Sequence, residues 1–68
     1  MSDIDQLIKM ANQIAENFSF HDDQVDRTVD HIRRFWAPPM RKKILAYAAN
    51  GGAGLSDPVV AALNKLEA

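Results

Sequence analysis

The chain has 68 residues, which is enough for one domain and too few for two. It contains no cysteine, and this excludes disulfides, thiolate zinc sites, cysteine-ligated iron–sulfur clusters and cysteine nucleophiles. Its formal net charge is −1. The start of the chain is acidic, which does not indicate a signal peptide, and the longest apolar run, Ile44 to Ala49, is too short to span a membrane. We therefore expect a cytoplasmic protein.

The charge is divided unevenly along the chain. Residues 1–32 carry seven acids and two bases, a net of −5, whereas residues 33–68 carry six bases and two acids, a net of +4. The bases cluster between Arg33 and Lys43, as in a nucleic-acid-binding surface. A net charge of −1 and an acidic first half favour the plainer interpretation of solvated basic side chains.

The first 37 residues lack both glycine and proline, which favours helices. We predict a first amphipathic helix over residues 3–18, with Ser2 as its cap and acids in its first turn. Its apolar side has three- and four-residue spacing and consists of Ile4, Leu7, Ile8, Ala11, Ile14, Ala15 and Phe18.

A second helix is predicted over residues 23–36, after the cap residues of segment 19–23. Its apolar stripe is Val25, Val29, Ile32 and Trp36, widened by Phe35. Ion pairs of Asp23 with Arg27 and of Asp30 with Arg34 are expected, because an acid four positions before a base stabilises a helix. The two prolines at 38 and 39 end this helix and begin the next.

A third helix is predicted over residues 39–49 and a short fourth over residues 58–66. Gly51 provides the left-handed cap of the third helix, and Asp57 with Pro58 begins the fourth. The glycines from 51 to 54 do not form a phosphate loop, because they follow a helix and no Lys-Ser/Thr pair accompanies them. The fold class is therefore all-α, one compact helical domain over residues 1–68, with three amphipathic helices and a short C-terminal helix.

No catalytic constellation is present in the sequence. His21 and His31 are ten positions apart and lack the Glu-x-x-His spacing of a metal site, so the acids near them are interpreted as a solvated face. No serine lies in a nucleophile elbow. We expect no catalytic, cofactor-binding or metal-ligating residue in this chain.

The segment from residue 32 to residue 41 has the composition of an interface centre. Two aromatic residues lead into a Pro-Pro corner flanked by arginines, and Trp, Phe, Met and Arg are enriched at such centres. Trp36 continues the apolar stripe and is expected in the core. The residues that we expect to contact a partner are Arg33, Arg34, Phe35, Met40 and Arg41.

Segments from almost the whole chain carry a resemblance to a known family. The segments concerned occur in order over almost the whole chain: Leu7 to Ala15, His31 to Trp36 with Pro38, Met40 and Arg41, Gly51 to Leu55, and Asp57 to Leu63. In this order and spacing they resemble the delta subunit of NAD-dependent, molybdenum- or tungsten-containing formate dehydrogenase.

The resemblance implies an accessory subunit that is not itself an enzyme. It implies binding to the catalytic alpha subunit within an alpha/beta/gamma/delta complex, and a role in assembling or stabilising that complex. Molybdopterin-guanine dinucleotide, iron–sulfur clusters and FMN are then held by the other subunits. Two alternatives remain from the residues themselves: a small helical nucleic-acid-binding module, and a homo-oligomer formed through exposed apolar faces.

Overall fold

The computed structural model describes residues 3–67, with the side chain of residue 67 excepted, and these residues form four helices. The helices are α1 (Asp3–Asn17), α2 (Gln24–Phe35), α3 (Pro38–Ala49) and α4 (Asp57–Glu67). Each end lies within one residue of the predicted range. The described residues contain no strand, so the all-α prediction is confirmed. The predicted cap Ser2 lies outside the described residues.

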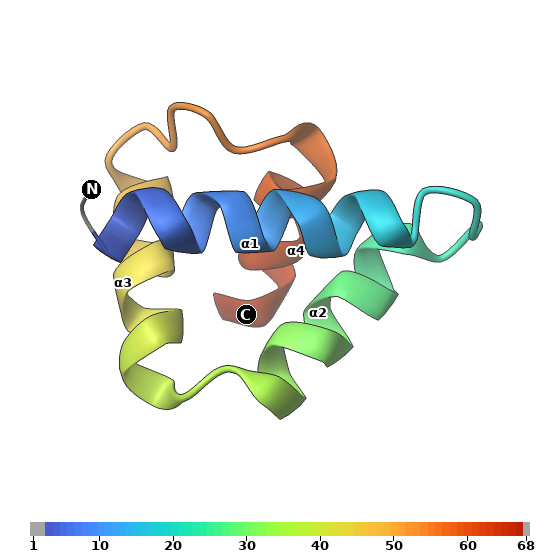
Figure 1. Cartoon of the computed structure of the whole chain (residues 1–68), viewed down its shortest axis with the longest axis horizontal. Coiled ribbons are helices and arrows are strands. Elements are labelled where there is room, and N and C mark those ends of the chain that lie inside the picture. Colours follow the sequence, from blue (N-terminus) through green and yellow to red (C-terminus); the bar gives the residue numbers. More distant parts are fainter. Residues whose placement is uncertain (1–2, 68) are drawn as a thin grey trace.

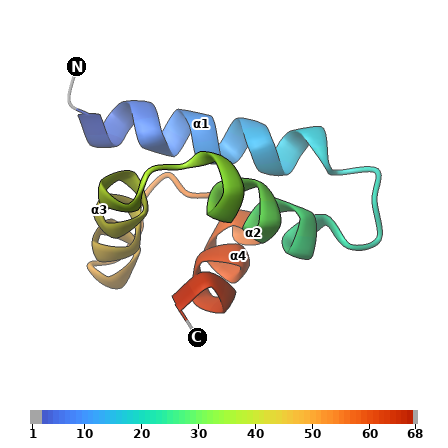
Figure 2. The same ribbon diagram turned by 90° about the horizontal axis from the view of Figure 1, so that it is seen from below.

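The helices pack around one core with α1 laid across the others (Figure 1). α1 contacts α2, α3 and α4, and α2 packs against α4. α3 stands near the N-terminal end of α1, at the opposite end of the molecule from the loop that joins α1 to α2 (Figure 2). The radius of gyration is 10.8 Å, close to the value of about 11 Å for a compact chain of this length.

The core draws on all four helices and on the residue that follows α2. Its buried members are Leu7, Ala11, Ala15, Ile32, Trp36, Ile44, Val59 and Leu63. Trp36 is 4% exposed, which confirms that it is a core residue. Thr28 is also fully buried, and its hydroxyl donates to the carbonyl oxygen of Gln24 at 2.8 Å.

Both predicted ion pairs of α2 are present. Arg27 Nε lies 2.7 Å from Asp23 Oδ1, and Arg34 Nε lies 3.0 Å from Asp30 Oδ1. Segment 19–23 supplies the cap residue of α2, as expected, because Asp23 occupies the cap position, but its side chain makes no cap hydrogen bond. Its carboxylate accepts from Arg27 instead.

α3 ends as predicted, with glycine in the positive-φ region. Gly51 and Gly52 have φ of 117° and 62°. Their N–H groups donate to the carbonyl oxygens of Ala48 at 3.2 Å and Tyr47 at 3.1 Å, the pair of bonds that defines a Schellman motif. The following loop is held by hydrogen bonds between its backbone and the side chains of Asn12 and Tyr47.

The start of α4 differs by one position from the prediction. The carbonyl oxygen of Ser56 accepts from the Val60 N–H at 3.0 Å, so Ser56 takes the cap position and Asp57 lies inside the helix. Pro58 remains in the first turn, where a missing N–H removes no intrahelical bond.

Candidate protein-interaction surface

Phe35 and Trp36 are adjacent in sequence and have opposite environments. Phe35 is 72% exposed, whereas Trp36 is 4% exposed. The apolar stripe that Phe35 widens in the sequence is therefore buried at Trp36 and exposed at Phe35. α2 ends at Phe35, and Trp36 follows it with an extended backbone, with ψ of 133°. An exposed phenylalanine beside a buried tryptophan is the most conspicuous apolar feature of this end of α2.

Phe35 is the end of a row of rings along α2 and the turn before it. Its ring centroid lies 4.7 Å from that of His31, and His31 lies 6.3 Å from Phe18. Phe18 also contacts His21 at 6.1 Å. Both histidines thus pack against Phe18. The described residues contain no group of three His, Cys, Asp or Glu side chains that could hold a metal ion.

A shallow groove runs beside Phe35 between α1 and the corner that joins α2 to α3. We define the methionine groove by its apolar lining residues, Met10, Ile14, Phe35, Trp36 and Met40. Its volume is about 610 Å³. It continues along α1 into a smaller hollow of about 280 Å³ that shares Met10 and Met40.

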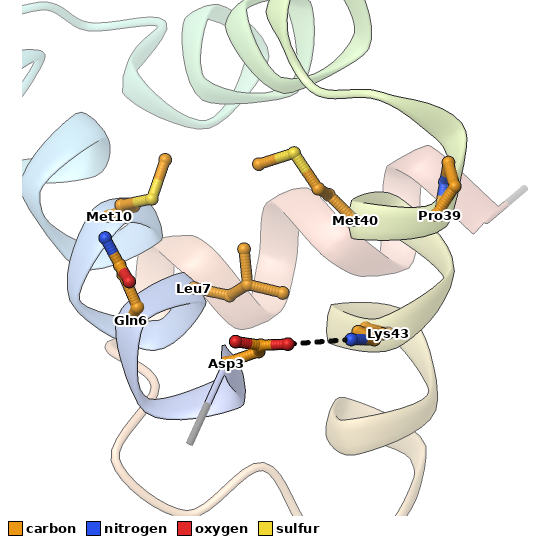
Figure 3. A pocket seen from close by; sticks show the side chains of 7 residues that line it. All are labelled: Asp3, Gln6, Leu7, Met10, Pro39, Met40 and Lys43. Atoms are coloured by element: carbon orange, nitrogen blue, oxygen red, sulfur yellow. Dashed lines mark hydrogen bonds and ion pairs between the residues drawn. The ribbon is translucent and has the colours of Figure 1, made fainter. Parts of the chain in front are cut away.

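The smaller hollow lies between α1 and α3 (Figure 3). Met10 from α1 and Met40 from α3 face each other across it, with Leu7 between the two helices (Figure 3). The far end is closed by an ion pair of Lys43 Nζ with Asp3 Oδ2 at 3.3 Å. Lys43 was expected only to solvate the surface, so this contact between α1 and α3 adds a structural role.

Arg41 is half-buried and bonds the backbone of α2. Its Nη1 donates to the carbonyl oxygen of Trp36 at 2.9 Å and to that of Arg33 at 3.1 Å. The last carbonyl groups of a helix lack intrahelical partners, and here the Arg41 guanidinium donates hydrogen bonds to carbonyl oxygens at the end of α2. Arg41 therefore holds the α2–α3 corner together, in addition to any contact with a partner.

The remaining arginines of the candidate set lie on different sides of α2. Arg34 lines the surface next to Phe35 and forms the predicted ion pair with Asp30. Arg33 and Phe35 are two positions apart, and side chains at that spacing leave a helix on opposite sides. The structure thus joins Phe35 and Met40 on one groove, places Arg34 beside Phe35 alone, and directs Arg33 elsewhere.

The clustered bases do not form one free cationic surface. Arg34 and Lys43 are paired with carboxylates, and Arg41 is bound to carbonyl oxygens. Only part of the cluster is therefore left to bind phosphates, which weighs against a nucleic-acid interface.

Met10 is a groove residue that was not predicted from the sequence. It is 37% exposed. A signal was present, because Met10 lies three positions after Leu7 and four before Ile14 and so extends the apolar side of α1. Phe20, in the turn after α1, was also not singled out; it is 95% exposed.

One carboxyl group near this surface has a shifted pKa. The hydrogen bond from Arg27 holds the pKa of Asp23 below its ordinary value of 3.8, with smaller contributions from its own backbone N–H and from the charges of Arg27 and His21. The side chains are exposed, so this is an ordinary surface ion pair. It gives the surface no acid–base chemistry of the kind a catalytic site uses.

Comparison with known proteins adds a family to this geometry. The family model described as "NADH-dependant formate dehydrogenase delta subunit FdsD" matches residues 6–63 of the chain. The match includes α2 and α3 entirely, together with the methionine groove. No curated protein and no solved structure matched the chain.

Proposed function

Because this chain belongs to the family of NADH-dependent formate dehydrogenase delta subunits, we propose that it binds the catalytic alpha subunit and supports assembly or stability of the active complex. A delta subunit has partner subunits by definition, and the proposal selects one of them. The observation that carries the proposal is the exposure of Phe35, 72%, beside an apolar groove. Aromatic anchors next to apolar hollows are where interface free energy concentrates.

The proposed contact residues are Arg33, Arg34, Phe35, Met40 and Arg41. Phe35 and Met40 form the apolar centre, because both line the methionine groove. Arg34 and the part of the Arg41 guanidinium that does not bond α2 belong to the rim. Arg33 reaches a partner only where that partner extends around the end of α2.

We further propose that the chain is not an enzyme on its own. Formate oxidation then takes place in the other subunits, which would hold molybdopterin-guanine dinucleotide, iron–sulfur clusters and FMN. The absence of cysteine supports this assignment for the clusters. Metal analysis and an absorbance spectrum of the isolated chain test it, since a stoichiometric metal or flavin would contradict the proposal.

The experiment for the proposed function is co-purification with the alpha subunit. A tagged form of this chain is co-expressed with that subunit, and the parent is compared with Phe35→Ala and Phe20→Ala. Phe20 is the matched control, because it is 95% exposed and lies in the turn after α1, outside the groove. We expect Phe35→Ala to weaken association by about 1 kcal/mol or more and Phe20→Ala to leave it unchanged. Failure of the parent chain to co-purify would contradict the proposed function itself.

A further inference from the structure

We infer that the methionine groove receives an amphipathic helix of the partner subunit, and that a carboxylate on this helix pairs with Lys9. The inference rests on the proposed function and names what fills the groove. Two of the groove's apolar side chains are methionines, which adapt their shape to a partner. The groove and its continuation follow α1 from Asp3 to Ile14, about 16 Å at 1.5 Å per residue, the length of three helical turns.

The groove walls favour a helix over an extended segment. Every residue that lines the groove belongs to α1, α2 or α3, apart from Trp36 just after α2, so no strand edge is available for pairing. An extended segment bound here would leave the backbone N–H and C=O groups that face the apolar part of the lining without partners, at a cost in free energy. A helix satisfies these groups internally and presents apolar side chains every three or four residues.

The charges around the groove select an acidic helix. Two lining residues, Asp3 and Lys43, neutralise each other. Lys9 also lines the groove, is exposed, and takes part in none of the ion pairs between described side chains. A carboxylate is the group that complements this ammonium.

The same charge disfavours a second copy of this chain. A symmetric dimer through the groove would bring the same face of both copies together, and the only acid that lines this face, Asp3, is already paired with Lys43 and so is not available to the Lys9 of the other copy. The partner's helix is expected to carry acids at its polar edge and apolar residues at positions such as i, i+3 or i+4, and i+7.

The test is site-specific photocrosslinking within the co-expressed complex of this chain with the alpha subunit. The photoreactive residue p-benzoylphenylalanine replaces Met10 in one sample and Val60 in another. Val60 is the matched control, because it has a similar exposure, 39% against 37%, and lies on α4 away from the groove. We expect position 10 to crosslink to a segment of the alpha subunit that has helical apolar spacing and at least one acid. We expect no crosslink to the alpha subunit from position 60.

Affinity measurements on the same complex supply an independent readout. Met10→Glu and Lys9→Glu should each weaken association about tenfold or more, the fold-change that corresponds to 1.4 kcal/mol. Val60→Glu and Lys42→Glu, which place acids outside the groove, should change association less than twofold. The helical circular dichroism of each free variant confirms that it is folded.

Several outcomes would overturn the inference while leaving the proposed function intact. These are a crosslink from position 10 to a second copy of this chain, a crosslink to a segment without helical spacing, and a complex that forms normally with no crosslink at position 10. Equal weakening by Met10→Glu and Val60→Glu would also overturn it. If the parent chain forms no complex with the alpha subunit, both the proposed function and this inference fail.

Discussion

The side-chain amide of Asn12 in α1 is bonded to the backbone of Gly54, 42 positions later in the chain. Asn12 Nδ2 donates to the Gly54 carbonyl oxygen at 2.8 Å, and Asn12 Oδ1 accepts from the Ser56 N–H at 2.9 Å. Both halves of the amide are therefore used, and they hold the α3–α4 loop against α1. The start of α4 is positioned by the same contact, since Ser56 is its cap.

Replacing Asn12 should destabilise the protein more than its partial exposure indicates. Asn12→Ala removes both hydrogen bonds, each worth about 0.5–1.5 kcal/mol, and the melting temperature should fall by several degrees. The melting temperature of Asn12→Asp should lie between those of the parent and Asn12→Ala, because aspartate keeps the acceptor and loses the donor. Thermal denaturation measures both.

Gln13→Ala is the matched control for these variants. Gln13 lies next to Asn12, and its amide bonds only Asn17 within α1, at 3.2 Å on an exposed surface. Its loss should change the free energy of unfolding by less than about 0.5 kcal/mol. Equal melting temperatures for Asn12→Ala and Gln13→Ala would show that the loop contact contributes little.

The positions of the helices could be predicted because their signals are local. The periodic apolar stripe of α1, the prolines at 38 and 39, and Gly51 act within a few residues, and each helix formed within one residue of the predicted bounds. Asn12 lies outside the apolar stripe of α1, and spacing indicates nothing more about it. Its partners are more than 40 positions away, and no local pattern indicates them.

The candidate surface was predicted in part for a related reason. Helical spacing identified Trp36 as core, and it is buried. Spacing also places Phe35 at the edge of this apolar stripe, but it does not indicate how far the core extends along α2, so it leaves open whether the Phe35 ring is buried. The hydrogen bonds of Arg41 to α2 require the turn at the α2–α3 corner, which composition does not describe.

The adjacent aromatic residues should respond to truncation in opposite ways. Trp36→Ala removes a buried side chain and should lower the free energy of unfolding by about 3–5 kcal/mol, a large share of the stability of so small a domain. Phe35→Ala should change it by less than about 0.5 kcal/mol, because the ring is mostly in solvent. Urea unfolding of the isolated chain measures both. Similar losses for the two variants would contradict the assignment of one to the core and the other to the surface.

The Asp23–Arg27 pair predicts a small dependence of stability on pH. The hydrogen bond from Arg27 lowers the folded-state pKa of Asp23 below 3.8. A group with a lowered folded pKa contributes stability that is present above its unfolded pKa and is lost as the pH falls through the folded value. Arg27→Gln should therefore raise the pKa of Asp23 towards 3.8, as followed by the carboxyl carbon signal in an NMR titration. Arg34→Gln is the control and should leave the titration of Asp23 unchanged, because Arg34 pairs with Asp30. If the pKa of Asp23 stays the same in Arg27→Gln, the Arg27 hydrogen bond is not the cause of the shift.

Arg41 should contribute to the stability of the free chain through the end of α2. Its guanidinium donates to the carbonyl oxygens of Arg33 and Trp36, so Arg41→Ala should lower the free energy of unfolding by about 1–2 kcal/mol. Arg41→Lys should recover part of this loss, because an ammonium keeps the charge. The recovery should be incomplete, because an ammonium lacks the planar fork that reaches both oxygens. Lys42→Ala is the control and should be nearly neutral. Lys42 is the next residue, and its exposed side chain makes no hydrogen bond with the described residues.

The same variants separate the structural role of Arg41 from its proposed contact with the alpha subunit. Arg41→Lys should still fold with α2 and α3 in place. A loss of affinity for the alpha subunit in this variant, measured at a temperature where the free chain is fully folded, would therefore belong to the interface. We expect such a loss, of about 1 kcal/mol, because a guanidinium pairs with carboxylates in a two-point geometry that an ammonium does not reproduce. An Arg41→Lys chain that is less stable and still binds the alpha subunit like the parent would confine Arg41 to the corner. The docking centre would then consist of Phe35 and Met40, which both line the methionine groove.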